Sequence, residues 1–193
     1  MKRLIVNADD YGMSQDINCG IIEAHRRGIV SSASLMATGD AYEHALLLAA
    51  NVNTLDLGAH IVLTGGWSCV DPHTPLPTTP TELLREIIGG RFDVGREIRS
   101  QLQKMKASGI TPSHINTHKG VHLFPPVMKA LANCAAEFGI KWIRLPIDLG
   151  WRTSSISLNA GSWMGSSPPV PGGSAVALRE RDAPQQITLS AYT

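Results

Sequence analysis

The feature that most constrains the fold is an alternation of short apolar segments with longer amphipathic ones, which runs from the start of the chain to about residue 150. The short segments have the length of buried strands, and the longer ones carry apolar residues near helical spacing. Strand and helix in strict turn indicate βαβ units and a parallel sheet. The predicted strands lie within residues 3–8, 29–38, 55–64, 113–124 and 141–146, and the predicted helices within residues 14–28, 40–52, 81–109 and 125–139.

Local signals place several ends of these elements. Ser14 is expected to cap the first helix, and Gly28 is a stop signal at its far end. The third helical segment should break near Gly89 and Gly90. Two prolines open the last helix, a position that suits proline because its missing N–H would be unpaired there anyway.

The pattern stops near residue 151. Residues 151–193 are rich in Ser, Pro and Gly and hold no sustained period, which is typical of a flexible tail. The sequence therefore predicts a βα domain over residues 1–150 and a tail over residues 151–193. A closed (β/α) barrel needs about 200–250 residues. We therefore expect either an open α/β sheet or a distorted TIM-like barrel that is incomplete at its C-terminus.

Composition excludes several classes of protein. A net charge of +1 gives no basic excess for nucleic-acid binding. No apolar run approaches the roughly 18 residues that suggest a membrane span. The N-terminus reaches two acids within ten residues, unlike a secretory signal, so we expect a cytoplasmic protein. The 3 cysteines are scattered and odd in number, which does not favour a disulfide framework or a zinc site.

Potential metal ligands cluster where the predicted strands end. Asp9 and Asp10 close the first strand, and His60 lies in the third. The fourth strand and its exit hold four more polar residues: His114, Asn116, His118 and His122. Because the carboxyl ends of parallel strands meet at one edge, these side chains can come together. Asp and His donors suit a divalent ion that acts as a Lewis acid and activates water.

The order of residues within each cluster suggests how they are used. In a strand, His114 and Asn116 share a face with His118, so His118 can reach the mouth while the other two lie beneath it. Of the paired acids, one could bind the metal while the other takes a proton from water as a general base. The charge of the metal would then offset the repulsion between the two carboxylates.

Simpler interpretations are open for each residue. The Asp-Asp-x-Gly stretch at Asp9 could be an Asx-turn that caps a helix. A strand histidine such as His60 is often a hydrogen-bonded core residue. Arg144 could face the site as a clamp for an anion or hydroxyl, or it could form a structural ion pair.

Taken together, five stretches resemble the YdjC-like carbohydrate deacetylases, a family that includes chitooligosaccharide deacetylases and hopanoid-biosynthesis-associated deacetylases. The resemblance runs in order from residue 3 to about residue 150. Its stretches are IVNADDYGMS, GIIEAHRRGIVSSASLM, LGAHIVLT, ITPSHINTHKGVHLFPPV and IRLP. It implies a distorted (β/α) barrel and metal-dependent hydrolysis of the N-acetyl group of an amino sugar, with Mg²⁺ or Zn²⁺ as the ion.

The resemblance also implies roles for single residues. Asp10, His60 and His118 would be the metal ligands. Asp9 would be the general base. Arg144 and His122 would contact the acetylated amino sugar, while His114 and Asn116 would lie behind the ligands and orient them. A homodimer is left open.

The sequence departs from the family pattern H-x-D-x-H-x-H-x-H in its fourth strand. Asn116 replaces the acid and Gly120 replaces a histidine. No histidine follows His122, although family members extend further and carry a general-acid histidine there. We therefore also expect a C-terminally truncated or frame-shifted chain.

Two other hypotheses follow from these departures. One is a non-catalytic remnant of the family that retains metal or sugar binding. The other is a different metal-dependent barrel enzyme, such as a sugar isomerase or a phosphoesterase. The second is disfavoured because the sequence holds no glycine-rich phosphate loop.

Overall fold

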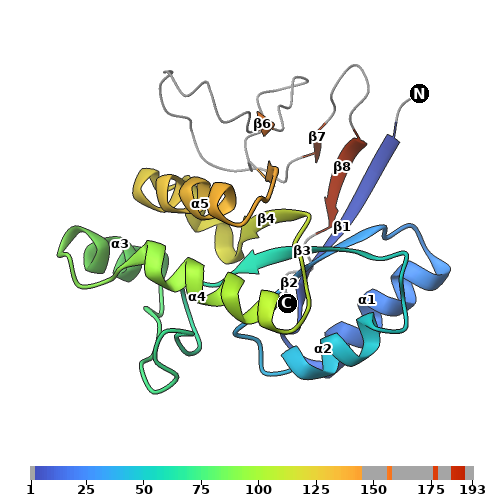
Figure 1. Ribbon diagram of the computed structural model, residues 1–193, viewed down its shortest axis with the longest axis horizontal. Coiled ribbons are helices and arrows are strands. Elements are labelled where there is room, and N and C mark those ends of the chain that lie inside the picture. Colours follow the sequence, from blue (N-terminus) through green and yellow to red (C-terminus); the bar gives the residue numbers. More distant parts are fainter. Residues whose placement is uncertain (1–2, 145–155, 158–175, 178–183, 190–193) are drawn as a thin grey trace.

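The computed structural model describes residues 3–144, 156–157, 176–177 and 184–189 (Figure 1). The strands are β1 (Arg3–Tyr11), β2 (Ser32–Leu35), β3 (Asp56–Ile61), β4 (His114–Thr117), β5 (Trp142–Ile143), β6 (Ile156–Ser157), β7 (Val176–Ala177) and β8 (Pro184–Leu189). The helices are α1 (Gln15–Arg27), α2 (Tyr42–Ala49), α3 (Pro80–Ile88), α4 (Val94–Ala107) and α5 (Pro125–Glu137), with a 3₁₀ segment η1 (His118–Leu123).

The strands form one sheet in the order β6-β5-β4-β3-β2-β1-β8-β7. Strands β1 to β5 are neighbours in chain order, and each consecutive pair is parallel. The α/β class and the parallel sheet are therefore confirmed. Within the described residues β6 and β7 are the two edges, and closure into a barrel stays a prediction. The parallel order brings the carboxyl ends of β1, β3 and β4 to the same edge.

Side-chain caps begin three of the helices. The hydroxyl of Ser14 accepts a hydrogen bond from the backbone N–H of Ile17 at 3.2 Å, as expected for the start of α1. The expected break in the third helical segment separates α3 from α4, and Gly90 adopts a φ of 66° there. Because a positive φ is accessible to glycine without a steric penalty, this residue lets the chain turn between the two helices.

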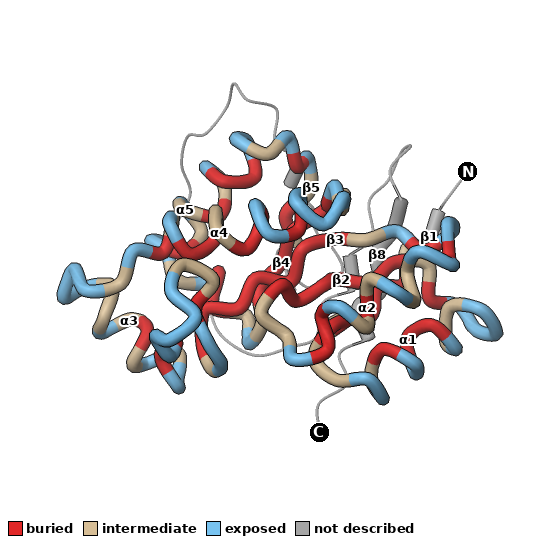
Figure 2. Tube along the Cα trace, turned by 60° about the horizontal axis from the view of Figure 1, so that its bottom comes forward, coloured by how far each residue is buried: buried red, intermediate tan, exposed pale blue. Residues whose placement is uncertain are grey.

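The two faces of the central strands differ in polarity. On one face, Ala33, Ile61 and Ile115 pack into the apolar core between the sheet and the helices. Helices α4 and α5 contribute residues such as Leu102 and Leu131 to this core. The other face carries a buried polar set: Asn7, Ser32, Ser34, His60, His114 and Asn116. The strands lie along the buried centre of the molecule, with exposed segments around them (Figure 2). The polar face is where the site is built.

Most of residues 151–193, the expected tail, lies outside the described residues. Its described parts are the short strands β6, β7 and β8, of which β8 pairs in parallel with β1 from Arg3 to Ala8. Among the helices of the described chain, none combines the length and the apolar character needed to cross a membrane.

Candidate metal centre at the carboxyl ends of the strands

A bulge in β1 brings the adjacent carboxylates to one side of the strand. The register between β1 and β2 shifts between Ala8 and Tyr11, and Asp10 adopts a φ of 62°. Neighbouring side chains of a regular strand point to opposite faces, whereas a bulge redirects one of them. The carboxylates of Asp9 and Asp10 consequently both approach the imidazole of His60, at 4.0 Å from Nδ1 and 3.0 Å from Nε2 respectively.

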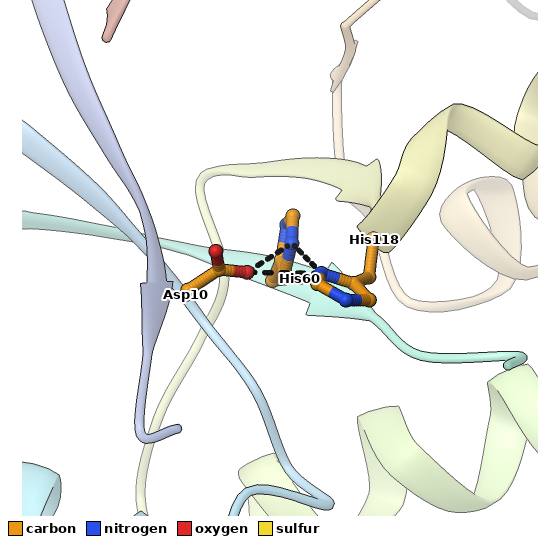
Figure 3. Close-up of side chains that lie close together, drawn as sticks. All are labelled: Asp10, His60 and His118. Carbon is orange, nitrogen blue, oxygen red and sulfur yellow. Dashed lines mark hydrogen bonds and ion pairs between the residues drawn. The ribbon is translucent and has the colours of Figure 1, made fainter. Parts of the chain in front are cut away.

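Asp10, His60 and His118 form a compact cluster contributed by β1, β3 and the start of η1 (Figure 3). Asp10 Oδ1 lies 3.0 Å from His60 Nε2 and 3.0 Å from His118 Nδ1. The two ring nitrogens are 3.4 Å apart, and the rings are nearly perpendicular, with an interplanar angle of 79°. The structure therefore brings together the three residues that the resemblance implies as ligands.

Asn116 fixes the orientation of the His60 ring. Its amide nitrogen lies 3.0 Å from Asp9 Oδ1, and a carboxylate can only accept, so the nitrogen faces Asp9 and the carbonyl oxygen faces His60. This oxygen lies 2.5 Å from His60 Nδ1, which must then carry the proton. The lone pair of His60 Nε2 is left directed at Asp10 and His118.

The donor set fits a divalent cation. A ligand atom from each of Asp10, His60 and His118 lies within 4.8 Å of the other two. A carboxylate oxygen and a lone pair of His60 face a common point, where a positive charge relieves their mutual repulsion. Two imidazoles and one carboxylate suit Zn²⁺, and an ion that keeps more water, such as Mg²⁺, suits the same open set.

Asp9 accepts hydrogen bonds from several buried donors. Arg144 binds both of its carboxylate oxygens, with Nη1 at 2.9 Å from Oδ1 and Nη2 at 2.8 Å from Oδ2. Ser34 Oγ, Asn7 Nδ2 and Asn116 Nδ2 also donate to Oδ1, at 2.7, 2.9 and 3.0 Å. The pair between Asp9 and Arg144 thus joins the first strand to the residue just after β5.

Both carboxyls have lowered pKa values. Burial raises the pKa of Asp9, but the neighbouring His60 imidazole and the charge and hydrogen bonds of Arg144 outweigh this and bring the pKa to about 2. Burial also raises the pKa of Asp10, but the imidazoles of His118 and His60 beside its carboxylate outweigh this, so that its pKa lies well below the usual range. Both groups are ionised at neutral pH, as a metal ligand and a proton acceptor require.

His114 lies on the polar face, deeper than the triad. Its imidazole fills the space beside Gly58, where an added Cβ would come within 2.2 Å of the ring. Ser113 Oγ lies 2.9 Å from its Nδ1, and burial lowers the pKa of His114 to about 4. The imidazole is therefore neutral at pH 7, and it supports the strands instead of touching the triad.

His122 and Arg144, the residues expected to contact substrate, are both engaged in side-chain interactions. His122 is buried, with Nδ1 against the hydroxyl of Thr117, and burial lowers its pKa to about 3. Arg144 is held by Asp9, which is the structural pairing left open from the sequence. Substrate contact by either residue stays a prediction.

Two residues that hold Asp9 were not foreseen from the sequence. Asn7 and Ser34 lie on the polar face of β1 and β2, and both donate to Asp9 Oδ1. The available signal was the alternation of polar and apolar residues in NADD and SSASL, which indicates a strand with one polar face.

The fold and the cluster define an α/β protein with a candidate metal centre at the carboxyl ends of its parallel strands. A family model described as YdjC-like protein matches residues 3–186, and the chain belongs to this family. The match extends past residue 150, where the resemblance was expected to end.

Similar proteins include two curated relatives and one solved structure. A carbohydrate deacetylase of Brevibacillus brevis is 38% identical over 77% of this chain and 60% of its own length. A chitooligosaccharide deacetylase of Escherichia fergusonii is 38% identical over 72% of this chain and 58% of its own. A crystal structure from Enterococcus faecalis V583, of a candidate cellobiose-phosphate cleavage protein, is 27% identical with a TM-score of 0.60, over 75% of this chain and 59% of its own. The chain thus spans about three fifths of the length of the curated relatives it matches.

Proposed function

We propose that this protein hydrolyses the N-acetyl group of an amino sugar or oligosaccharide with the help of a divalent metal ion. The observation that carries the proposal is the cluster of Asp10, His60 and His118 beside the paired Asp9 and Arg144, in a chain of the YdjC-like family. The names of the relatives, carbohydrate deacetylase and chitooligosaccharide deacetylase, support the substrate class.

The three proposed ligand residues contribute different kinds of donor atom to the ion. Asp10 supplies a negative charge, while His60 and His118 supply neutral nitrogen donors. Asn116 keeps the proton of His60 on Nδ1, so that Nε2 is available. A divalent ion held there would polarise the amide carbonyl and acidify the attacking water.

Asp9 is the proposed proton acceptor. Its pKa of about 2 makes it ionised at working pH but a weak base, so it accepts a proton only from water that is made acidic. Arg144 holds both carboxylate oxygens and fixes the direction in which they point. The guanidinium also adds a positive charge beside Asp9, next to the candidate metal centre.

The proposal extends to contact of His122 and Arg144 with the sugar, to a location in the cytoplasm and to a homodimer. The identity of the ion, Mg²⁺ or Zn²⁺, belongs to the same proposal.

The direct test is acetate release from N,N′-diacetylchitobiose by the metal-stripped chain, before and after addition of Mg²⁺ or Zn²⁺. We expect release that depends on the ion, and a loss of about 10²–10⁴ in rate for Asp9→Asn, because that change removes the proton acceptor. Leu47→Ala, at an exposed site on α2, is the matched control. Ion binding by folded protein without acetate release would contradict the hydrolase proposal and favour a binding-only role.

A further inference from the structure

The segment between β3 and α3 folds back on itself into a short arm, residues 64–77, seen in teal and green at the lower left of Figure 1. Backbone hydrogen bonds join its two sides. The N–H of Gly65 donates to the carbonyl of Pro77 at 2.8 Å, and the N–H of Leu76 donates to that of Gly66 at 3.0 Å. The arm is therefore an ordered structure within the loop that directly follows a metal-ligand strand.

A buried carboxylate ties the arm to α4. Glu97 is 2% exposed and accepts from Ser68 Oγ at 2.5 Å, from the N–H of Cys69 at 2.9 Å and from Gln101 Nε2 at 2.9 Å. Gln101 also bonds the backbone of Val62 through both its amide atoms, at 3.0 and 2.6 Å. Because a buried charge is costly unless it is fully hydrogen-bonded, this network holds the arm in one place.

The root of the arm lies at the mouth of the candidate site. Leu76 packs in a small apolar cluster with Met36 and Val62, which follow β2 and β3. Met13, from the loop just after the paired acids, packs against the same cluster. On its other side, the arm approaches the ammonium of Lys119, which lies 3.9 Å from the position of an added Cβ on Gly65. The arm thus spans the exits of strands that carry ligands.

The arm presents an exposed indole. The Trp67 residue is 56% exposed, and no other Phe, Trp or Tyr among the described residues is exposed. Its backbone forms a bridge with Pro75 across the arm, so its position is set by the fold. A tryptophan held in place on the surface offers a large flat area for binding at a low cost in conformational entropy.

We propose that Trp67 is the platform on which a second sugar ring of an N-acetylglucosamine oligosaccharide stacks, next to the ring whose acetamido group lies at the triad. The proposal rests on the proposed function and adds a preference for an oligosaccharide over a single sugar. A pyranose ring with equatorial substituents has a flat face of C–H groups that matches an indole, while its hydroxyls stay at the edge in water. The arm starts just beyond β3, the strand that carries His60, and Gly65 at its root faces Lys119, the residue that follows His118.

The test is calorimetric binding of N,N′-diacetylchitobiose and N-acetylglucosamine to the full chain, in EDTA so that no turnover occurs. We expect Trp67→Ala to weaken binding of the disaccharide about tenfold and binding of the single sugar by a smaller factor. Trp67→Phe should retain part of the preference, because it keeps an aromatic face. Leu47→Ala, an exposed apolar residue on α2, should leave both constants unchanged.

Equal weakening of both sugars by Trp67→Ala, no weakening, or no binding of the disaccharide by the parent chain would overturn the proposal. Acetate release with added metal separates the two claims. Release together with binding that does not depend on Trp67 would overturn the platform and leave the hydrolase standing. Trp67-dependent binding without release would support the platform and contradict the hydrolase.

Discussion

Strands β1 to β4 carry apolar side chains on the face that packs against the helices and polar side chains on the opposite face. On the apolar face, Ile115 lies in the main core. Its neighbour Asn116 lies on the polar face and bonds both His60 and Asp9. Adjacent residues of β4 therefore differ in what they contact: Ile115 packs in the core, and Asn116 orients the side chain of a candidate metal ligand. Substitutions at neighbouring positions should accordingly affect different properties.

The largest effect on stability is expected on the apolar face. Ile115→Ala removes a fully buried side chain and should lower the free energy of unfolding by about 2–5 kcal/mol. Urea denaturation measures this loss, with Ile115→Val, at about 0.5–1.5 kcal/mol, as the graded control. The metal affinity of the protein that stays folded should not change. A lower metal affinity in folded Ile115→Ala would contradict the separation of roles between the two faces.

On the polar face, His114 makes the stability of the protein depend on pH. Its pKa is about 4 in the folded chain, against about 6.5 when unfolded, so the unfolded state binds more protons between these values. Stability should be complete above pH 6.5 and fall by roughly 2–3 kcal/mol as pH decreases toward 4. Urea midpoints measured from pH 7.5 to 4.5 would show this slope. His114→Gln should reduce this slope and leave the part contributed by His122, whose pKa burial also lowers, and an unchanged slope in that variant would assign the effect to other groups.

The smallest expected effect tests how the polar face supports the ligands. Asn116→Ala removes the acceptor that keeps the proton of His60 on Nδ1, and should weaken Zn²⁺ binding by about 10–100-fold. Calorimetric titration of the metal-stripped chain measures it, with Ile115→Val as the control on the same strand. Equal affinity in the variant and the parent chain would show that His60 needs no such partner.

The helices, the strands and the meeting of acidic and histidine side chains could be predicted from the sequence, because they depend on local patterns and on the order of the strands. Helical spacing and caps such as Ser14 act locally, and the parallel order follows from the alternation of strands and helices. Once the strands are parallel, Asp10, His60 and His118 must approach one another at their carboxyl ends. Residue type and order then suffice to anticipate a cluster of Asp and His side chains, whereas the choice of Asp10 over Asp9 rested on the family resemblance.

The surroundings of Asp9 could not be predicted, because they depend on register. Ser34 reaches Asp9 through the bulge in β1, and Arg144 reaches it from beyond β5, 135 residues away in the sequence. A buried glutamate such as Glu97 was equally hidden, since a charged residue in an amphipathic helix is expected to face solvent. These contacts involve pairs whose meeting is decided by packing over the whole domain.

Titration of Zn²⁺ into metal-stripped His60→Ala shows whether Asp10, His60 and His118 together hold a divalent ion. We predict single-site binding by the parent chain and a loss of affinity in His60→Ala that is larger than the loss in Asn116→Ala, because the variant removes a ligand atom and not its support. Ile115→Val should bind like the parent chain. Zn²⁺ binding that is unchanged in folded His60→Ala would contradict the account.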